Sequence, residues 1–258
     1  MLQETTDKVQ LRLVRLAPQP AFSVNPQSWY VLLKDAMDTV LSLGLLLLSA
    51  PVILLAGLLV KLTSAGPVFY SQIRVGRQGR LFRIYKIRTM RHNCESLTGP
   101  QWSGPGDWRI TPVGGFLRRT HIDELPQLWN VLKRDMSLIG PRPERPEFVD
   151  RLDAVVPLYR ERLLVRPGIT GLAQLHLPPD TDLKSVRRKL AYDLYYIRML
   201  NFWLDFRILI TTGFQFLGAP SRLFCWMLRL PRGEKVERAY LDVAADALPK
   251  PDLQPVYV

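Results

Sequence analysis

The stretch Thr39-Val-Leu-Ser-Leu-Gly-Leu-Leu-Leu-Leu-Ser-Ala-Pro-Val-Ile-Leu-Leu-Ala-Gly-Leu-Leu-Val60 decides what kind of protein this is. Its 22 residues carry no charge, and about 20 apolar residues suffice to cross the hydrocarbon core of a bilayer. A secretory signal would place its apolar segment at the very N-terminus, whereas here a mixed polar extension, residues 1–33, comes first. We therefore expect residues 34–62 to form a retained membrane helix.

Pro51 falls near the middle of this segment. Proline has no N–H and displaces the carbonyl four residues back, here that of Leu47. Each half is then roughly 15–18 Å long at about 1.5 Å per residue, about half of a 30 Å hydrocarbon core. An ordinary spanning helix is the alternative, but we favour a re-entrant helix that breaks at Ser49 and Pro51, with the Ser49 hydroxyl serving a freed backbone group.

The charges that flank the apolar segment favour the same topology. Basic residues on both sides are natural if both ends stay in the cytoplasm, although Asp35 and Asp38 weaken this pattern on the N-terminal side. A dense run of arginines follows the segment, and four bases precede it: Lys8, Arg12, Arg15 and Lys34.

A second informative stretch is Arg118-Arg-Thr-His-Ile-Asp-Glu-Leu-Pro-Gln127. Adjacent carboxylates surrounded by arginine suit chemistry on a phosphorylated substrate. Apolar residues recur at helical spacing from Leu125 to Leu132, so we expect a helix from about Asp123 with Pro126 in its first turn. Asp123 and Glu124 would then lie at a helix N-terminus, which favours phosphate, although simple capping would also explain an acidic pair there.

The composition of the chain limits its partners. At 258 residues it could hold one large domain or two small ones. The net charge of +12 and the pI near 10.0 predict an anionic partner, either nucleic acid, an anionic membrane surface or a phosphate-bearing substrate. Cys94 and Cys225 match no metal spacing, so we expect reduced, structural thiols.

The remaining sequence predicts an α+β, mainly helical fold with one membrane-associated catalytic domain. Val68–Val75 and Leu81–Ile87 predict a small β-hairpin, and Leu183–Leu200 predicts an amphipathic helix. Ile208–Ser221 is too short to span, which favours an interfacial helix, although a core helix is nearly as good an interpretation. We place the catalytic domain at residues 63–218 and a C-terminal tail at residues 219–258, and we expect the residues beyond Leu230 to be loosely ordered.

The hairpin region carries seven bases and no acid between Arg74 and Arg91. Most of them predict a solvated or lipid-facing surface that meets anionic headgroups. Lys86 and Arg88 are the candidates for contact with substrate phosphate.

The other motifs in the sequence give little support for a further function. Asp180-Thr181-Asp182 matches an Asp-x-Asp metal motif of nucleotide-sugar glycosyltransferases, but it precedes a basic helix and capping explains it well. The chain has no dinucleotide fingerprint and no P-loop. The three histidines are scattered and none pairs with a nucleophile motif.

Several segments together resemble the bacterial sugar transferase family, the monotopic phosphoglycosyl transferases, in its short form. The resemblance covers about residues 34–217 in consistent order. It rests on these segments: Gly66–Tyr70, Arg74–Gly76, Tyr85–Met90, Asp107–Thr111, Asp123–Gln127, Asn130–Leu132, Asp135–Pro143, Arg166–Gly171, Asp193–Tyr196 and Asp205.

This resemblance implies transfer of a sugar phosphate from a UDP-sugar to a membrane polyprenol phosphate such as undecaprenyl phosphate, which initiates assembly of a surface polysaccharide. Asp123 would be the nucleophile that expels UMP and holds a covalent phosphosugar. Glu124 would be associated with Mg²⁺, and Arg118 and Arg142 with phosphate. The location implied is the bacterial inner membrane, with the catalytic domain facing the cytoplasm.

The chain departs from the family pattern at a few positions. Lys34-Asp35 stands where the family usually has Lys-Arg, and Ala50-Pro51 where it has Ser-Pro. The family's usual Asn-Gly-Arg after the residue matching Gln174 is absent, so we assign no sugar. A catalytically silent membrane scaffold for polysaccharide assembly is the alternative, and we expect no nucleic-acid partner. The oligomeric state is left open.

Overall fold

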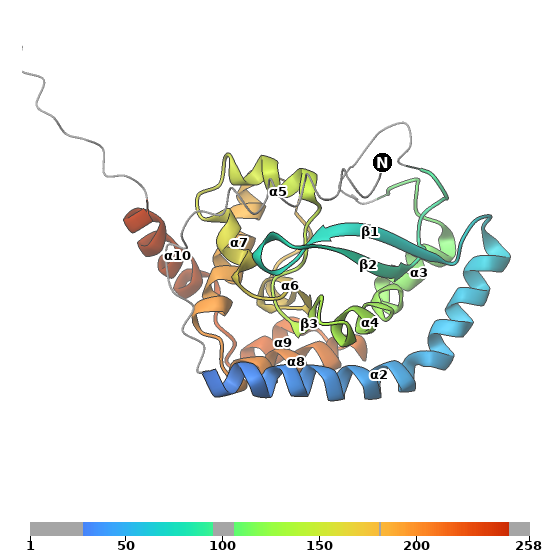
Figure 1. The fold of residues 1–258 in the computed structure, drawn as a ribbon, viewed down its shortest axis with the longest axis horizontal. Helices are drawn as coiled ribbons and strands as arrows, with labels where there is room; N and C mark the ends of the chain where they lie inside the picture. The colour runs from blue at the N-terminus through green and yellow to red at the C-terminus, as the bar shows by residue number, and fades with distance from the viewer. Residues whose placement is uncertain (1–27, 95–105, 181, 248–258) are drawn as a thin grey trace, which may run out of the picture.

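The computed structural model describes residues 28–94, 106–180 and 182–247. The long helix α2 (Ser28–Thr63) runs along one edge of the molecule, with α8 (Phe202–Phe216) tied to it through Asp205. The hairpin of β1 (Phe69–Val75) and β2 (Leu81–Ile87) lies across the middle (Figure 1). This arrangement confirms a mainly helical fold with a small hairpin and a long apolar N-terminal helix.

Helix α2 is continuous across Pro51 and bends in its C-terminal half (Figure 1). The expected break therefore takes the form of a bend, because only the hydrogen bonds around one proline are lost. The Ser49 hydroxyl donates to the carbonyl of Leu46 at 3.3 Å, one residue before the carbonyl that Pro51 displaces. Within Trp29–Thr63, only 17% of the most apolar stretch is buried, unlike a core helix of a soluble protein.

Both ends of α2 are held against the rest of the fold. Near its start, the Lys34 ammonium donates to Asp205 at 2.7 Å, and Arg166 pairs with Asp35 at 2.6 Å. Near its end, Ala56 and Val60 pack in a small buried cluster with Ile87 and Leu117. The intervening leucines are exposed over most of the helix, so its apolar surface is left for a lipid environment.

The predicted hairpin is confirmed. Strands β1 (Phe69–Val75) and β2 (Leu81–Ile87) pair antiparallel, with Phe69 opposite Ile87 and Val75 opposite Leu81. The turn η1 (Arg77–Gly79) places Gln78 and Gly79 at positive φ. Of the seven bases from Arg74 to Arg91, Arg88 is buried, Arg74 and Lys86 are partly buried, and the other four are exposed.

The middle of the chain packs beneath the hairpin. Its elements are α3 (Pro112–Arg119), η2 (Ile122–Glu124), α4 (Gln127–Leu132), β3 (Ser137–Ile139), α5 (Pro146–Asp153), η3 (Tyr159–Leu164) and β4 (Gly168–Thr170). Strands β3 and β4 pair in parallel, which the sequence did not predict. A Cβ at Gly168 would lie 2.1 Å from the Gly140 nitrogen, so this crossing of the two segments requires glycine.

Helices make up most of the described C-terminal part: α6 (Leu172–His176), α7 (Leu183–Arg198), α8 (Phe202–Phe216), α9 (Ser221–Met227) and α10 (Gly233–Ala247). The prediction for α7 is confirmed. The prediction of a loose tail beyond Leu230 was wrong up to Ala247, because Val236 of α10 is fully buried and anchors that helix. Residues 248–258 lie outside the described range.

Candidate active site

Asp123 and Glu124 lie in the single turn η2, which connects α3 to α4. The expected helix from Asp123 was wrong, since α4 begins at Gln127 and Pro126 is its N-cap. Pro126 has no N–H to continue an α-helical ladder backwards. His121 takes a left-handed conformation with φ 55°. The Glu124 N–H donates to the His121 carbonyl at 3.1 Å and closes the turn.

Glu124 is buried between two bases. Lys86 from β2 donates to its Oε1 at 2.7 Å, while Arg142 donates to both carboxylate oxygens, to Oε2 at 3.2 Å. Burial alone would raise the pKa of Glu124, but Arg142 and Lys86 hold this pKa well below its usual range. Glu124 is therefore an ionised anchor for these two cations.

Asp123 has a different environment. Its side chain is buried, with 5% of its surface exposed, and its carboxylate accepts no hydrogen bond from the residues that the structure describes. Burial raises its pKa above the ordinary 3.8, the positive charge of Lys86 opposes this rise, and the negative charge of Glu124 adds to it. A carboxylate without hydrogen-bond donors keeps its lone pairs available for reaction.

Arg118, on α3, is the third base near Asp123 and Glu124, the pair of carboxylates called the dyad from here on. Its Nε donates to the Thr89 hydroxyl at 2.8 Å, and its charge lowers the pKa of Asp123. The helix is placed by Thr111, whose side chain caps it at the Gly114 N–H, and by the contact of Gly114 with the Thr89 backbone. A Cβ at Gly114 would lie 2.0 Å from the Thr89 carbonyl oxygen, so the close approach of α3 depends on glycine.

Arg88 lies apart from these groups. Its guanidinium donates to the carbonyl of Ser64 at 2.8 Å and to that of Ala65, just beyond the end of α2. This geometry favours a structural role, and the predicted phosphate contact would require the guanidinium to leave these carbonyls. Of the four candidate phosphate ligands, the structure thus brings Lys86, Arg118 and Arg142 to the dyad.

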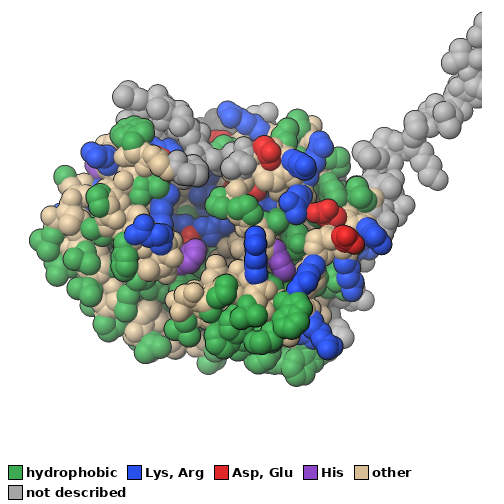
Figure 2. All heavy atoms as spheres, turned by 180° about the vertical axis from the view of Figure 1, so that it is seen from behind, with side chains coloured by type: hydrophobic (Ala, Val, Ile, Leu, Met, Phe, Trp, Pro, Cys, Tyr) green, Lys and Arg blue, Asp and Glu red, His purple; other side chains and the backbone are tan. Residues whose placement is uncertain are grey.

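The dyad adjoins the apolar side of the molecule. The His121 ring, two residues before Asp123, meets the ring of Phe216 at a centroid distance of 5.7 Å. Phe216 ends α8, which is tied to α2 through Asp205. The face seen in Figure 2 is hollowed near its middle, with Lys and Arg side chains in and around the hollow and hydrophobic side chains below it. A charged site thus lies close to a lipid-compatible surface.

The described residues contain no group of three or more potential metal ligands among His, Cys, Asp and Glu. Mg²⁺ does not require such a group, because it is commonly held by one or two carboxylates together with substrate phosphates and water. Asp123 and Glu124 are the carboxylates available here. The residues present fit a magnesium ion that arrives with a diphosphate.

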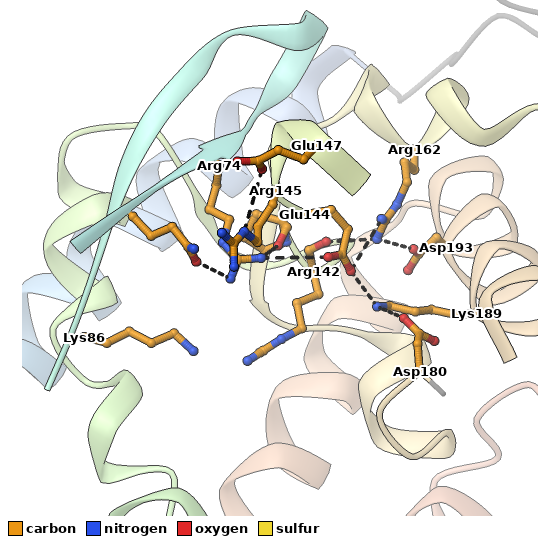
Figure 3. A network of polar contacts seen from close by, with 12 residues as sticks. Arg74, Lys86, Arg142, Glu144, Arg145, Glu147, Arg162, Asp180, Lys189 and Asp193 are labelled. Carbon is orange, nitrogen blue, oxygen red and sulfur yellow. Dashed lines mark hydrogen bonds and ion pairs between the residues drawn. The ribbon is translucent and has the colours of Figure 1, made fainter. Parts of the chain in front are cut away.

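A second charged network lies next to the dyad and was missed by sequence reasoning (Figure 3). Its centre is Glu144, which accepts from Lys189 at 2.8 Å and lies 3.9 Å from Arg162 and 3.8 Å from Arg74. Arg162 also donates to the carbonyl of Arg142 at 2.9 Å, so the network holds the backbone of the arginine that binds Glu124. The only sequence signal was one acid within the basic stretch from Arg142 to Arg145.

Asp180 and Asp182 have structural partners. The Asp182 carboxylate caps α7 through the Ser185 N–H at 2.7 Å, in a reciprocal capping box. Asp180 pairs with Lys189 at 2.7 Å. Capping, the interpretation favoured from the sequence, is confirmed for Asp182.

Comparison with known proteins identifies the class to which this fold and site belong. A family model described as bacterial sugar transferase matches residues 29–219. The chain therefore belongs to the bacterial sugar transferase family, as the resemblance predicted.

Three relatives illustrate the family. The chain is 45% identical, over 74% of its length, to a UDP-N-acetylgalactosamine-undecaprenyl-phosphate N-acetylgalactosaminephosphotransferase of Aeromonas hydrophila, of which it spans 45%. It is 43% identical, over 69% of its length, to a UDP-glucose:undecaprenyl-phosphate glucose-1-phosphate transferase of Caulobacter vibrioides, of which it spans 67%. It is 41% identical, over 70% of its length, to the exopolysaccharide production protein PSS of Rhizobium leguminosarum bv. phaseoli, of which it spans 94%.

Proposed function

We propose that this protein transfers a sugar phosphate from a UDP-sugar to undecaprenyl phosphate or a similar polyprenol phosphate, and so begins assembly of a surface polysaccharide. The observation that carries the proposal is the buried Asp123 carboxylate, which accepts no hydrogen bond from the described residues and lies beside three bases. The relatives of Aeromonas hydrophila and Caulobacter vibrioides, which are named for UDP-sugars and undecaprenyl phosphate, support the same substrates.

The first step is attack by an Asp123 oxygen on the sugar-bearing phosphorus. A bond forms between that oxygen and phosphorus, the phosphoanhydride bond breaks, and UMP leaves with the bonding electrons. Two anions repel each other, so Lys86, Arg118 and Arg142 must offset the charge on the diphosphate. Arginine suits this role because its planar fork pairs two phosphate oxygens at once.

The second step regenerates the carboxylate. An oxygen of polyprenol phosphate attacks the same phosphorus, the acyl phosphate bond to Asp123 breaks, and a new phosphoanhydride forms. In this scheme Mg²⁺ would be held by Glu124 with diphosphate oxygens and would reduce the charge on the phosphates. Lys86 and Arg142, which now share the Glu124 carboxylate, could then turn toward the substrate.

The membrane location is part of the proposal. The acceptor phosphate lies at the headgroup plane, so a shallow re-entrant α2 would keep the dyad at the depth of that phosphate. Both ends of α2 would then face the cytoplasm. Cysteines at Ser28 and Arg80, in a background without Cys94 and Cys225, should be equally protected from an impermeant thiol reagent in intact cells. Labelling of only one position would contradict re-entrance.

The covalent step is tested directly by the mass of the intact protein. Incubation with UDP-sugar and Mg²⁺ in detergent, without acceptor, should add one phosphosugar to the wild type and nothing to Asp123→Asn. Because the first step is reversible, labelled UMP should also exchange into UDP-sugar without any lipid. Exchange that requires the lipid acceptor would leave Asp123 at most a general base. A panel of UDP-sugars in the same assay would identify the sugar.

A further inference from the structure

A hollow of about 640 Å³ lies between α9 and the start of α10. It is lined by Trp226, Met227, Arg229, Leu230, Pro231, Arg232 and Lys235. It lies beyond residue 219, where the match to the family model ends. The dyad and its bases are not among its lining residues, so the hollow is separate from the candidate active site.

The three bases of the hollow are not neutralised within the described part of the chain. Arg229, Arg232 and Lys235 are exposed, and their side chains make no hydrogen bond or ion pair with a described residue. The nearby acids of α10 have other partners, since Glu234 pairs with Arg238 at 3.8 Å and Glu237 with Arg188 at 3.0 Å. The hollow therefore presents concentrated positive charge.

The apolar side of the hollow continues the lipid-compatible surface of the protein. Trp226 is 60% exposed and Met227 is 54% exposed, although both are large and apolar. Helix α9 is joined to α8 by the stacked rings of Phe214 and Phe224, whose centroids are 4.0 Å apart. Helix α8 is in turn tied to α2 through Asp205, and Figure 2 shows hydrophobic side chains with Lys and Arg beside them at the lower edge of the face.

We propose that this hollow binds the headgroup phosphate of an anionic bilayer phospholipid. Arg229, Arg232 and Lys235 would donate to the phosphate, and Trp226 and Met227 would lie against the glycerol and upper acyl chains. Tryptophan and basic residues are the side chains that favour the headgroup layer of a membrane. A bilayer lipid fits better than the reacting acceptor, because the lining contains no carboxylate that could take part in phosphoryl transfer. The inference rests on the membrane location in the proposed function.

Quenching of Trp226 fluorescence by brominated lipids tests this proposal. The full chain is reconstituted in phosphatidylcholine bilayers that contain a minority of phosphatidylglycerol, with bromine on the acyl chains of one lipid or the other. The signal of Trp226 is the difference between the wild type and Trp226→Phe. When the brominated lipid is present at the same mole fraction in both cases, brominated phosphatidylglycerol should quench this signal at least about twice as strongly as brominated phosphatidylcholine.

Two triple variants locate the preference. Arg229→Gln, Arg232→Gln and Lys235→Gln together should abolish the preference for phosphatidylglycerol. Arg77→Gln, Arg80→Gln and Lys184→Gln remove the same charge at exposed sites on the hairpin turn and α7, and should preserve it. Equal quenching by both lipids in the wild type, or equal loss in both triple variants, would overturn the site.

The remaining arms separate this site from the catalytic proposal. Polyprenol phosphate at low mole fraction should leave quenching by brominated phosphatidylglycerol unchanged. Relief of quenching would assign the hollow to the acceptor and overturn the bilayer-lipid proposal. UMP release in detergent micelles without phospholipid should be the same in the wild type and in the Arg229, Arg232 and Lys235 variant. Failure of UMP release in the wild type itself would count against the proposed function, whatever the lipid quenching shows.

Discussion

The dyad and the Glu144 network are two neighbouring clusters of acids and bases that differ in their balance of charge. The Glu144 network joins three acids to three bases: Glu144, Asp180 and Asp193 with Arg74, Arg162 and Lys189. The two acids of the dyad, Asp123 and Glu124, are instead surrounded by three bases: Lys86, Arg118 and Arg142. Both clusters are largely buried, so burial alone does not distinguish them.

The difference shows in the state of individual carboxylates. Although burial alone would raise the pKa of Glu144, Lys189, Arg162 and Arg74 lower it to about 2. Asp123 instead has a raised pKa and accepts no hydrogen bond from a described residue. A cluster in which every acid is paired with a base stabilises the fold. A cluster with one base in excess, and with an acid that accepts no hydrogen bond, can instead receive an anionic ligand. This contrast predicts different consequences for substitutions that look alike.

Asp123→Asn should cause the largest loss. The amide keeps the shape but lacks the anionic oxygen that attacks phosphorus, so UMP release should fall by about 10⁴-fold or more. Folding should survive, because the native pKa of Asp123 is raised, and a buried carboxylate with a raised pKa opposes folding at neutral pH. Thermal unfolding in detergent should show an unchanged or slightly higher midpoint.

Asp180→Asn is the matched control for this substitution, because it removes one acid from the balanced network. It should keep most of the activity. An active Asp123→Asn protein, after mass spectrometry has excluded deamidation back to Asp, would remove Asp123 from the mechanism.

Glu144→Gln should act mainly on stability. It leaves Lys189 and Arg162 buried without their shared anion, so the free energy of unfolding should fall by about 3 kcal/mol, roughly a hundredfold in the folding equilibrium. The native pKa of Glu144 is about 2, below its ordinary 4.5. The stability from its pairing is therefore present above about pH 4.5 and is lost as the pH falls toward 2.

Unfolding of the wild type and Glu144→Gln should therefore be compared across this pH range. The difference between them should shrink as the pH falls from 4.5 to 2. A constant difference would mean that packing, and not the charge of Glu144, stabilises this region.

Lys86→Gln should shift the pH dependence of the reaction. Burial raises the pKa of Asp123, and the positive charge of Lys86 is the first influence that opposes the rise. Without that charge the pKa of Asp123 should rise further, so the acid limb of kcat/KM should move to higher pH. At a fixed pH on that limb, activity should fall about tenfold if the limb moves by one pH unit, since the reaction requires the ionised carboxylate.

Arg83→Gln provides the comparison for Lys86. Residues 83 and 86 lie on the same strand, but side chains alternate, so their side chains leave opposite faces of β2. Arg83→Gln should leave the acid limb in place. A Lys86→Gln profile that is unmoved, or moved to lower pH, would show that Lys86 does not tune Asp123.

The sequence predicted the elements that depend on local pattern. The hairpin, α7 and the apolar helix follow from alternation, helical spacing and composition, all readable within one segment. The boundary at Pro126 was missed because the left-handed His121 and the tight turn after it depend on packing. Helix α10 was missed because charged residues dominate the segment, although Val236, Ala239 and Tyr240 recur at helical spacing and pack against the core.

The site was predictable to a similar degree. Asp123, Glu124, Lys86, Arg118 and Arg142 are brought together as the motifs indicated. The Glu144 network was not predictable, because it joins β1, η3 and α7 across long sequence separations. Arg88 belongs to the same basic run as Lys86, and only the fold distinguishes their surroundings.

The smallest effect, on the magnesium requirement, is expected at Asp180 and Asp182, the alternative candidate for a metal site. Asp182→Asn and Asp180→Asn should leave the Mg²⁺ concentration for half-maximal activity unchanged within about twofold, since both carboxylates are engaged in structural contacts. Glu124→Gln should raise that requirement by about tenfold or more, because Mg²⁺ binds ionised carboxylates together with phosphate oxygens. Magnesium titration of UMP release measures all three variants. A tenfold higher requirement in Asp182→Asn would place the metal at the Asp-x-Asp motif and would leave Glu124 only as the anchor of Lys86 and Arg142.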